Sequence, residues 1–182
     1  MIAISTAYWP TVEDGEEILN EIDRLGFESI ELSSYTGKNQ LDTMLPSLRR
    51  KNPKVVSLHN PCPKYEPQGF SWENNLPEPL LTAIDTDERL AAFSIVEKSM
   101  ELAADLEALA LVLHLGETSL SPQEEWLKTL YDQERIESDE GKERISQMLD
   151  ERARAGEAIW DPLQYSLEAI TRKAEKLDLF MG

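Results

Sequence analysis

The feature that most constrains the fold is a repeated alternation of short aliphatic runs with longer amphipathic stretches. The predicted strands are residues 2–5, 29–32, 55–59 and 109–114. Each run is followed, directly or after a loop, by a segment with helical spacing of its apolar residues, of which 86–106 is the strongest. This order is typical of βα units with parallel strands. The sequence therefore predicts an α/β protein.

Side-chain alternation along these strands separates two unlike faces, because successive residues of a strand point to opposite sides of the sheet. One face collects large aliphatic residues: Ile2, Ile4, Ile30, Leu32, Val56, Leu58, Leu109, Leu111 and Leu113. The other face is small near the strand starts and polar near the strand ends: Ala3, Ser5, Ser29, Glu31, Val55, Ser57, His59, Ala110, Val112 and His114. A doubly wound sheet is aliphatic on both faces. We therefore predict a (β/α)8 TIM barrel, whose polar mouth lies at the C-terminal ends of its strands.

The predicted barrel is partial. The 182 residues fit a single domain. After the fourth strand, residues 117–161 are predicted to form an acidic helical excursion, and Pro162 is predicted to open another helix. A fifth strand begins only at Leu179, so we expect about four to five parallel strands with outer helices, truncated before the C-terminal strands. The open strand edge of such a sheet is a place where a homodimer could form.

The chain has only two histidines, His59 and His114, and both are predicted to end neighbouring strands on the polar face. Adjacent parallel strands would hold the imidazoles about 5–7 Å apart, which suits a shared metal ion or a bridging water. The alternative is that each histidine only hydrogen-bonds at its strand end. Glu31 lies on the same face and is a candidate third ligand, general base or partner that orients a histidine, or else a solvated carboxylate.

Three further residues near the predicted mouth are candidate substrate contacts. Asn60 and Lys64 follow His59 in a proline-rich loop, and Trp9 follows the first strand and could stack on a sugar ring. Turn chemistry for the loop residues and aromatic packing for the tryptophan are the alternatives. Cys62 is interpreted as structural, because no motif around it argues for a nucleophile.

Several short motifs resemble the sugar-phosphate isomerase/epimerase group of xylose-isomerase-like barrels, which includes the AP endonuclease family 2 proteins. The similar stretches are Gly26 to Leu32, Val55 to Pro61, Ala103 to Leu106 and Leu111 to Gly116. The resemblance implies that His59 and His114 bind a divalent metal, such as Zn, Mn or Co, and that Glu31 is a pocket carboxylate. In that family the next strand carries a metal-binding glutamate. Here the sequence ends at Gly182 before such a residue, so we expect this chain alone to be inactive.

Charge narrows the range of partners. The chain has 18 basic and 35 acidic residues, a formal net charge of −17, which disfavours a nucleic-acid partner. It shows no secretory signal or membrane-spanning run, and a cytoplasmic location is expected.

Three hypotheses therefore remain open for function. The first is a metal-dependent isomerase or epimerase that acts on a sugar or sugar phosphate in the complete barrel. The second is an endonuclease IV-like enzyme that cleaves at abasic sites. The third is a non-catalytic domain that self-associates, with Trp126, Leu127, Leu130 and Tyr131 as the contact stripe.

Overall fold

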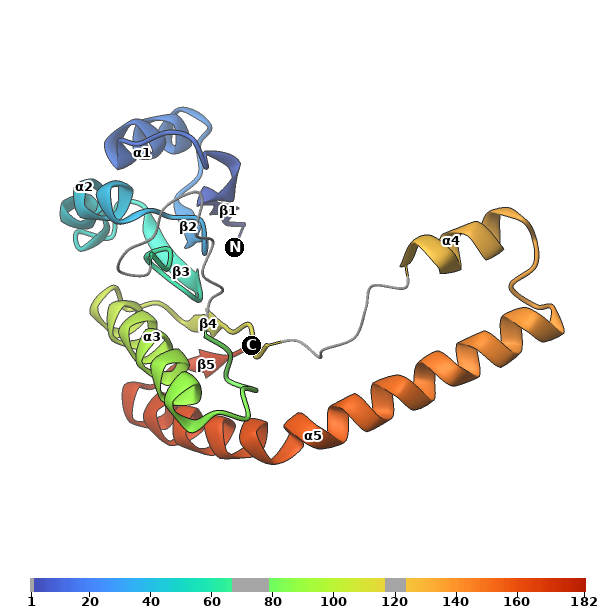
Figure 1. The fold of residues 1–182 in the computed structure, drawn as a ribbon. Helices are drawn as coiled ribbons and strands as arrows, with labels where there is room; N and C mark the ends of the chain where they lie inside the picture. The colour runs from blue at the N-terminus through green and yellow to red at the C-terminus, as the bar shows by residue number, and fades with distance from the viewer. Residues whose placement is uncertain (1, 67–78, 117–123) are drawn as a thin grey trace.

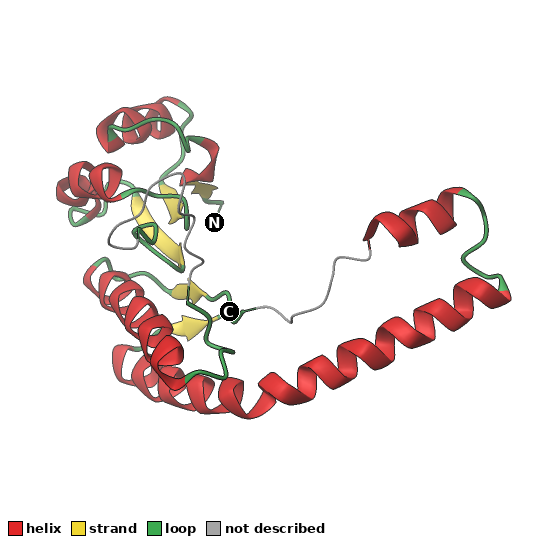
Figure 2. Cartoon of the chain, in the orientation of Figure 1, coloured by secondary structure: helices red, strands yellow, loops and turns green. Residues whose placement is uncertain are grey.

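The computed structural model describes residues 2–66, 79–116 and 124–182, and it is an α/β structure with one parallel sheet (Figures 1 and 2). The strands are β1 (Ile4–Ser5), β2 (Ser29–Leu32), β3 (Lys54–His59), β4 (Ala110–Val112) and β5 (Phe180–Met181), paired in the order β1-β2-β3-β4-β5. The helices are η1 (Thr6–Tyr8), α1 (Gly15–Arg24), α2 (Lys38–Leu48), α3 (Thr86–Asp105), α4 (Glu124–Asp132) and α5 (Asp139–Leu177). The predicted α/β class is confirmed. An all-parallel sheet flanked by helices is consistent with a partial TIM-barrel-like fold.

Local sequence signals set the helix ends. The side chains of Asp14, Asp85 and Ser138 accept hydrogen bonds from backbone N–H groups in the first turns of α1, α3 and α5. Such N-caps satisfy donors that the helix itself leaves unpaired. Gly26 adopts a φ of +78° just after α1, a conformation that glycine reaches without strain. Helix α1 ends at Arg24, two residues before this glycine.

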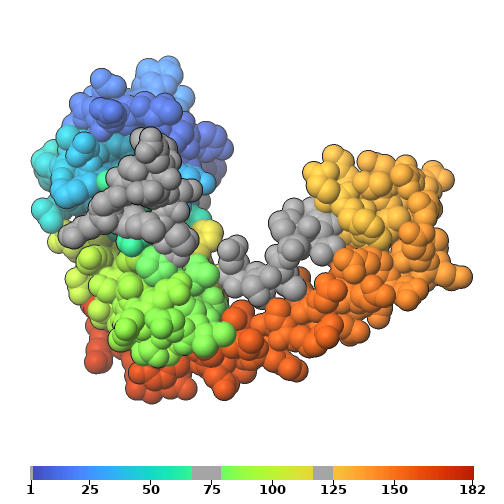
Figure 3. All heavy atoms as spheres, in the orientation of Figure 1, coloured from blue at the N-terminus to red at the C-terminus, as the bar shows by residue number. Residues whose placement is uncertain are grey.

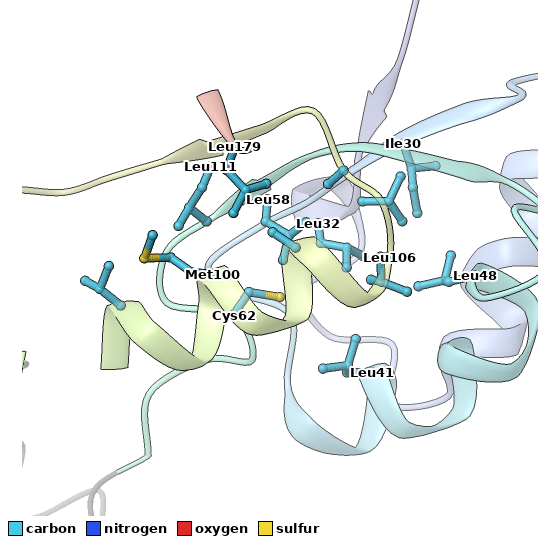
Figure 4. Close-up of a cluster of buried hydrophobic side chains, with 14 of the residues drawn as sticks. Ile30, Leu32, Leu41, Leu48, Leu58, Cys62, Met100, Leu106, Leu111 and Leu179 are labelled. Carbon is cyan, nitrogen blue, oxygen red and sulfur yellow. The ribbon is translucent and has the colours of Figure 1, made fainter. Parts of the chain in front are cut away.

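The core lies between the sheet and the helices on one of its faces (Figure 4). The strands contribute Ile30, Leu32, Leu58 and Leu111, and each of these side chains is completely buried. The helices contribute Ile18, Ile22, Met44, Leu48, Met100 and Ile170. The predicted aliphatic face packs against the helical layer except at three residues: Ile2 and Leu109, which are exposed, and Val56, which is not part of the core cluster.

One irregularity corrects the predicted alternation. Ile30 pairs with Val55, but Glu31 pairs with Ser57, so β3 carries an extra residue, Val56, at this point. A bulge of this kind shifts every residue on one side of it to the other face. Val55, predicted on the polar face, is instead buried in the core beside Ile30. Beyond the bulge, Ser57 pairs with Glu31, and both residues belong to the predicted polar face.

Two element boundaries also differ from the predictions. β4 ends at Val112, so His114 lies two residues beyond the strand rather than at its last position. Pro162 does not open a helix: it lies inside α5, which runs unbroken for 39 residues. Proline removes one backbone donor from a helix, and the remaining hydrogen bonds of this long helix keep it continuous. Residues 67–78 of the predicted proline-rich loop and the start of the excursion, 117–123, lie outside the described residues.

The predicted acidic excursion forms a projecting arm, defined here as residues 124–163, which contains α4 and the first part of α5. Figures 1 and 3 show the arm standing away from the rest of the molecule, the βα body (residues 2–66, 79–116 and 164–182). Within the arm, only Leu130 and Gly141 are buried among residues whose side-chain exposure is described. No helix in the described ranges has the length and apolar character needed to cross a membrane.

Candidate functional site

The two histidines meet at the C-terminal edge of the sheet. His59 is the last residue of β3, and its backbone neighbour on β4 is Val112, two residues before His114. The Nε2 atoms of the two rings lie 2.6 Å apart. The ring centroids are 4.6 Å apart and the ring planes are inclined by 15°, so the two rings meet edge to edge through these nitrogens. The predicted convergence is found, and it is tighter than the predicted 5–7 Å.

This approach constrains the protonation of the pair. Two nitrogen atoms at this distance are in hydrogen-bond range, so one ring must donate an N–H to the lone pair of the other. Burial lowers the pKa of His59, the nearby His114 lowers it further, and the negative charge of Glu31 acts in the opposite direction. The neutral form of His59 is therefore favoured, and a neutral imidazole is the form that binds metal ions.

Glu31 lies on β2, the strand adjacent to β3, and its side chain is held in place. Ser57 Oγ donates a hydrogen bond of 3.0 Å to Glu31 Oε2. This pairing follows from the sheet register, which sets Glu31 beside Ser57. Among the described residues, no group of three or more histidine, cysteine, aspartate or glutamate side chains is arranged to hold a metal ion. Glu31 is thus placed within electrostatic range of His59 without completing a three-ligand set.

A divalent cation bound by both histidines would need their nitrogens farther apart than they lie here. Nitrogens about 2.0–2.1 Å from a tetrahedral ion lie roughly 3.3 Å from each other. The Nε2 atoms, now 2.6 Å apart, would have to separate by roughly 0.7 Å. His114 is exposed and lies beyond the end of β4, so its ring is free of the packing that fixes a strand residue. A cation held by both rings would require this shift of the His114 ring.

Asn60 is placed differently from its predicted role. Its side chain is buried, and its Oδ1 accepts a hydrogen bond of 2.9 Å from Ser99 Oγ on α3. Its backbone N–H donates to the carbonyl oxygen of Val112. The side chain is directed to the helical layer rather than the mouth. Asn60 therefore anchors the loop that follows His59.

Lys64 and Trp9 lie at the predicted edge but away from the histidines. Lys64 is exposed and lines a hollow of about 370 Å³ between the loops that follow β1, β2 and β3. The charged residues around this hollow are Glu13, Lys38, Lys64 and Glu66, and neither histidine lines it. Trp9 is half-buried against the core, which matches the packing alternative, and its neighbour Tyr8 is 76% exposed.

Two residues, Ser57 and Ser99, matter more than the sequence indicated. Ser57 holds Glu31, and its place on the predicted polar face was the available signal. Ser99 donates to Asn60 and accepts from the backbone N–H of Cys62, but nothing in the α3 sequence marks it. Cys62 itself is buried, which raises the pKa of its thiol to about 12 and agrees with a structural role.

No model of a known protein family and no curated protein matches this chain.

Proposed function

We propose that His59 and His114 bind a divalent transition-metal cation at the C-terminal edge of the sheet, within a xylose-isomerase-like barrel that moves a proton on a sugar or sugar phosphate. The observation that carries this proposal is the 2.6 Å approach of the two Nε2 atoms at the C-terminal ends of adjacent parallel strands. Imidazole nitrogens are common ligands of zinc and its neighbours in the first transition series. The C-terminal ends of parallel strands are also where barrels of this kind place their chemistry.

Each residue has a distinct part in this proposal. When bound, the cation would polarise a hydroxyl or carbonyl oxygen of the sugar. Glu31 is the candidate general base, because a carboxylate beside the pair can accept the proton from the neighbouring carbon. The hydrogen bond from Ser57 fixes the direction of that carboxylate. The hollow lined by Lys38 and Lys64 offers a charged surface on the same edge for the polar groups of the ligand.

A metal titration of the full chain tests the proposal directly. Because the chain has only two histidines, its imidazole NMR signals belong to His59 and His114 alone. We expect Zn²⁺, Mn²⁺ or Co²⁺ to bind with one ion per chain and to shift both sets of signals. His59→Gln and His114→Gln should each abolish this binding, since each removes half of the ligand set.

Two matched variants separate the metal site from its surroundings. Cys62→Ser removes the only thiol and should leave binding unchanged, because that thiol is buried and protonated. Glu31→Gln should weaken metal affinity by about 10–100-fold, as expected for a residue that acts through a ligand, whereas each histidine substitution should abolish binding. If no ion binds at millimolar concentration, or if binding survives both histidine substitutions, the proposed site is wrong.

Proton transfer needs a separate assay. Exchange of the carbon-bound proton of sugar phosphates in deuterated water, followed by NMR, reports this step without knowledge of the product. Where the wild-type protein exchanges the carbon-bound proton of the sugar phosphate, Glu31→Gln should lower the exchange rate by at least about a hundredfold, within the range of general-base catalysis. Equal rates for the two proteins would remove Glu31 from the role of base.

A further inference from the structure

Helix α5 carries one continuous stripe along both of its halves. From the arm toward the C-terminus, the residues of this stripe follow alternating steps of four and three: Ile145, Leu149, Arg152, Gly156, Ile159, Leu163, Ser166 and Ile170, with Ala174 four residues further on. This 3.5-residue spacing is the seam of a left-handed coiled coil. In the βα body the seam is buried at Ser166, Ile170 and Ala174, and α5 packs there on α3. The six seam residues from Ile145 to Leu163 are called the arm seam below.

The arm seam has the same pattern but no comparable cover. None of its six residues is buried, and Leu149 is 61% exposed. Trp126 on α4 contacts α5 through Arg144, which is next to the seam rather than part of it. Helices in proteins obtain most of their stability by packing an amphipathic face on something else. The arm seam therefore extends an existing helix interface beyond the point where its partner helix ends.

When two copies of the arm seam are placed antiparallel, each apolar residue of one copy faces an apolar residue of the other. If two arms cross near residues 152–156, Ile145 faces Leu163 of the partner subunit and Leu149 faces Ile159 of the partner subunit. At the centre, Arg152 faces Gly156 of the partner subunit. Gly156 has open space around its Cα, so the long arginine side chain can be accommodated. A two-fold dimer uses the same patch on both copies, so each of these facing pairs occurs twice, once on each side of the axis.

Charge supports the same register. Arg152 and Glu157 have no hydrogen-bond or ion-pair partner within the described part of the chain, whereas other arm charges such as Arg135 and Glu140 pair with each other. In the antiparallel arrangement, Arg152 of each copy comes next to Glu157 of the other copy. The dimer would contain this ion pair twice. The arm seam spans about 27 Å, enough for several packed layers.

We propose that two copies of this chain dimerise by antiparallel pairing of their projecting arms along the arm seam. The pairing buries the partly or fully exposed leucine and isoleucine side chains of the arm seam and pairs Arg152 with Glu157 of the other copy. The arm pairing does not involve the histidines, so the test of the dimer is independent of the test of the metal site. It also differs from dimerisation through the open strand edge, because it leaves β1 and β5 uncovered.

The mass of the full chain in solution, measured by light scattering and sedimentation, tests the proposal. We expect a dimer at protein concentrations on the order of 10–100 μM. Leu149→Glu should abolish the dimer, since it places a charge in an apolar layer on each side of the two-fold axis. Leu149 is mostly exposed in the single chain, so this change should leave the helical content unaltered.

A charge exchange tests the register itself. Arg152→Glu and Glu157→Arg should each weaken the dimer by about tenfold, because two pairs become repulsive in every dimer. The double variant should recover most of the wild-type affinity. Arg154→Glu is the matched control: it makes the same charge change on the opposite side of α5 and should leave the dimer unchanged. A wild-type monomer at about 100 μM, or a double variant no better than the single variants, would overturn the proposal.

Discussion

The βα body and the projecting arm share one helix but differ in what that helix touches. In the body, α5 buries Ser166, Ile170 and Ala174 against its neighbours. In the arm, the same helix continues with the same spacing, and its seam residues stay partly or fully exposed. The amphipathic pattern of a helix thus predicts which face packs against another element, but it does not predict whether that element belongs to the same chain. The following predictions test this contrast.

The largest difference is expected between matched core truncations in the two halves of α5. Ile170→Ala removes a fully buried side chain from the core and should lower the free energy of unfolding by about 2–5 kcal/mol. Leu149→Ala, at protein concentrations where the chain is monomeric, should change it by no more than about 0.5 kcal/mol. Chemical denaturation followed by circular dichroism measures both. Equal losses would mean that the arm is packed within the single chain.

A smaller loss is expected inside the body when a buried polar contact is removed. Ser99 donates to Asn60 Oδ1 and accepts from the backbone N–H of Cys62. Ser99→Ala leaves both buried groups without this partner and should cost about 1–3 kcal/mol. Ser146→Ala, at an exposed position in the arm, is the control and should be close to neutral. A neutral Ser99→Ala would show that the loop after His59 is held by other contacts.

The pH dependence should also differ between the two regions, because both histidines belong to the body. The pKa of His59 is lowered in the folded state, so the unfolded chain takes up a proton first as the pH falls. The contribution of His59 to stability is therefore complete above the ordinary pKa of about 6.5 and is lost as the pH falls through the lower folded value. Denaturation curves at pH 7.5 and 5.5 should show this loss, and His59→Gln should reduce it. An unchanged pH dependence in the variant would mean that other groups dominate.

The smallest effect is expected at the ion pairs that join α3 to α5. Lys173 Nζ lies 2.8 Å from Glu97 Oε1 and 2.9 Å from Glu101 Oε1. Ion pairs that remain partly exposed to solvent contribute little, so Lys173→Met should cost less than about 1 kcal/mol. The loss should shrink further at 1 M salt, where charges are screened over about 3 Å. A loss as large as that of Ile170→Ala would show that charge rather than apolar burial fastens α5 to the body.

The site shows where sequence reasoning succeeded and where it failed. Strand-end position and alternation brought His59, His114 and Glu31 to one edge, because parallel strands end together and successive side chains alternate. The same reasoning misplaced Val55, because the bulge at Val56 adds a residue that no local pattern revealed. It also predicted Asn60 in the mouth, whereas the hydrogen bond from Ser99 directs that side chain under α3. A loop residue takes its direction from partners that are distant in sequence.

The sequence by itself determined the order of the elements, the aliphatic face of the sheet and the residues at its C-terminal edge. These properties follow from short-range periodicity and from the chirality of βα units, which act before any distant contact forms. Only the tertiary structure decided the 2.6 Å approach of the histidine rings, the continuity of α5 through Pro162 and the exposure of the arm seam. Each of these depends on how separate segments pack, and packing energy is shared among residues that lie far apart along the chain.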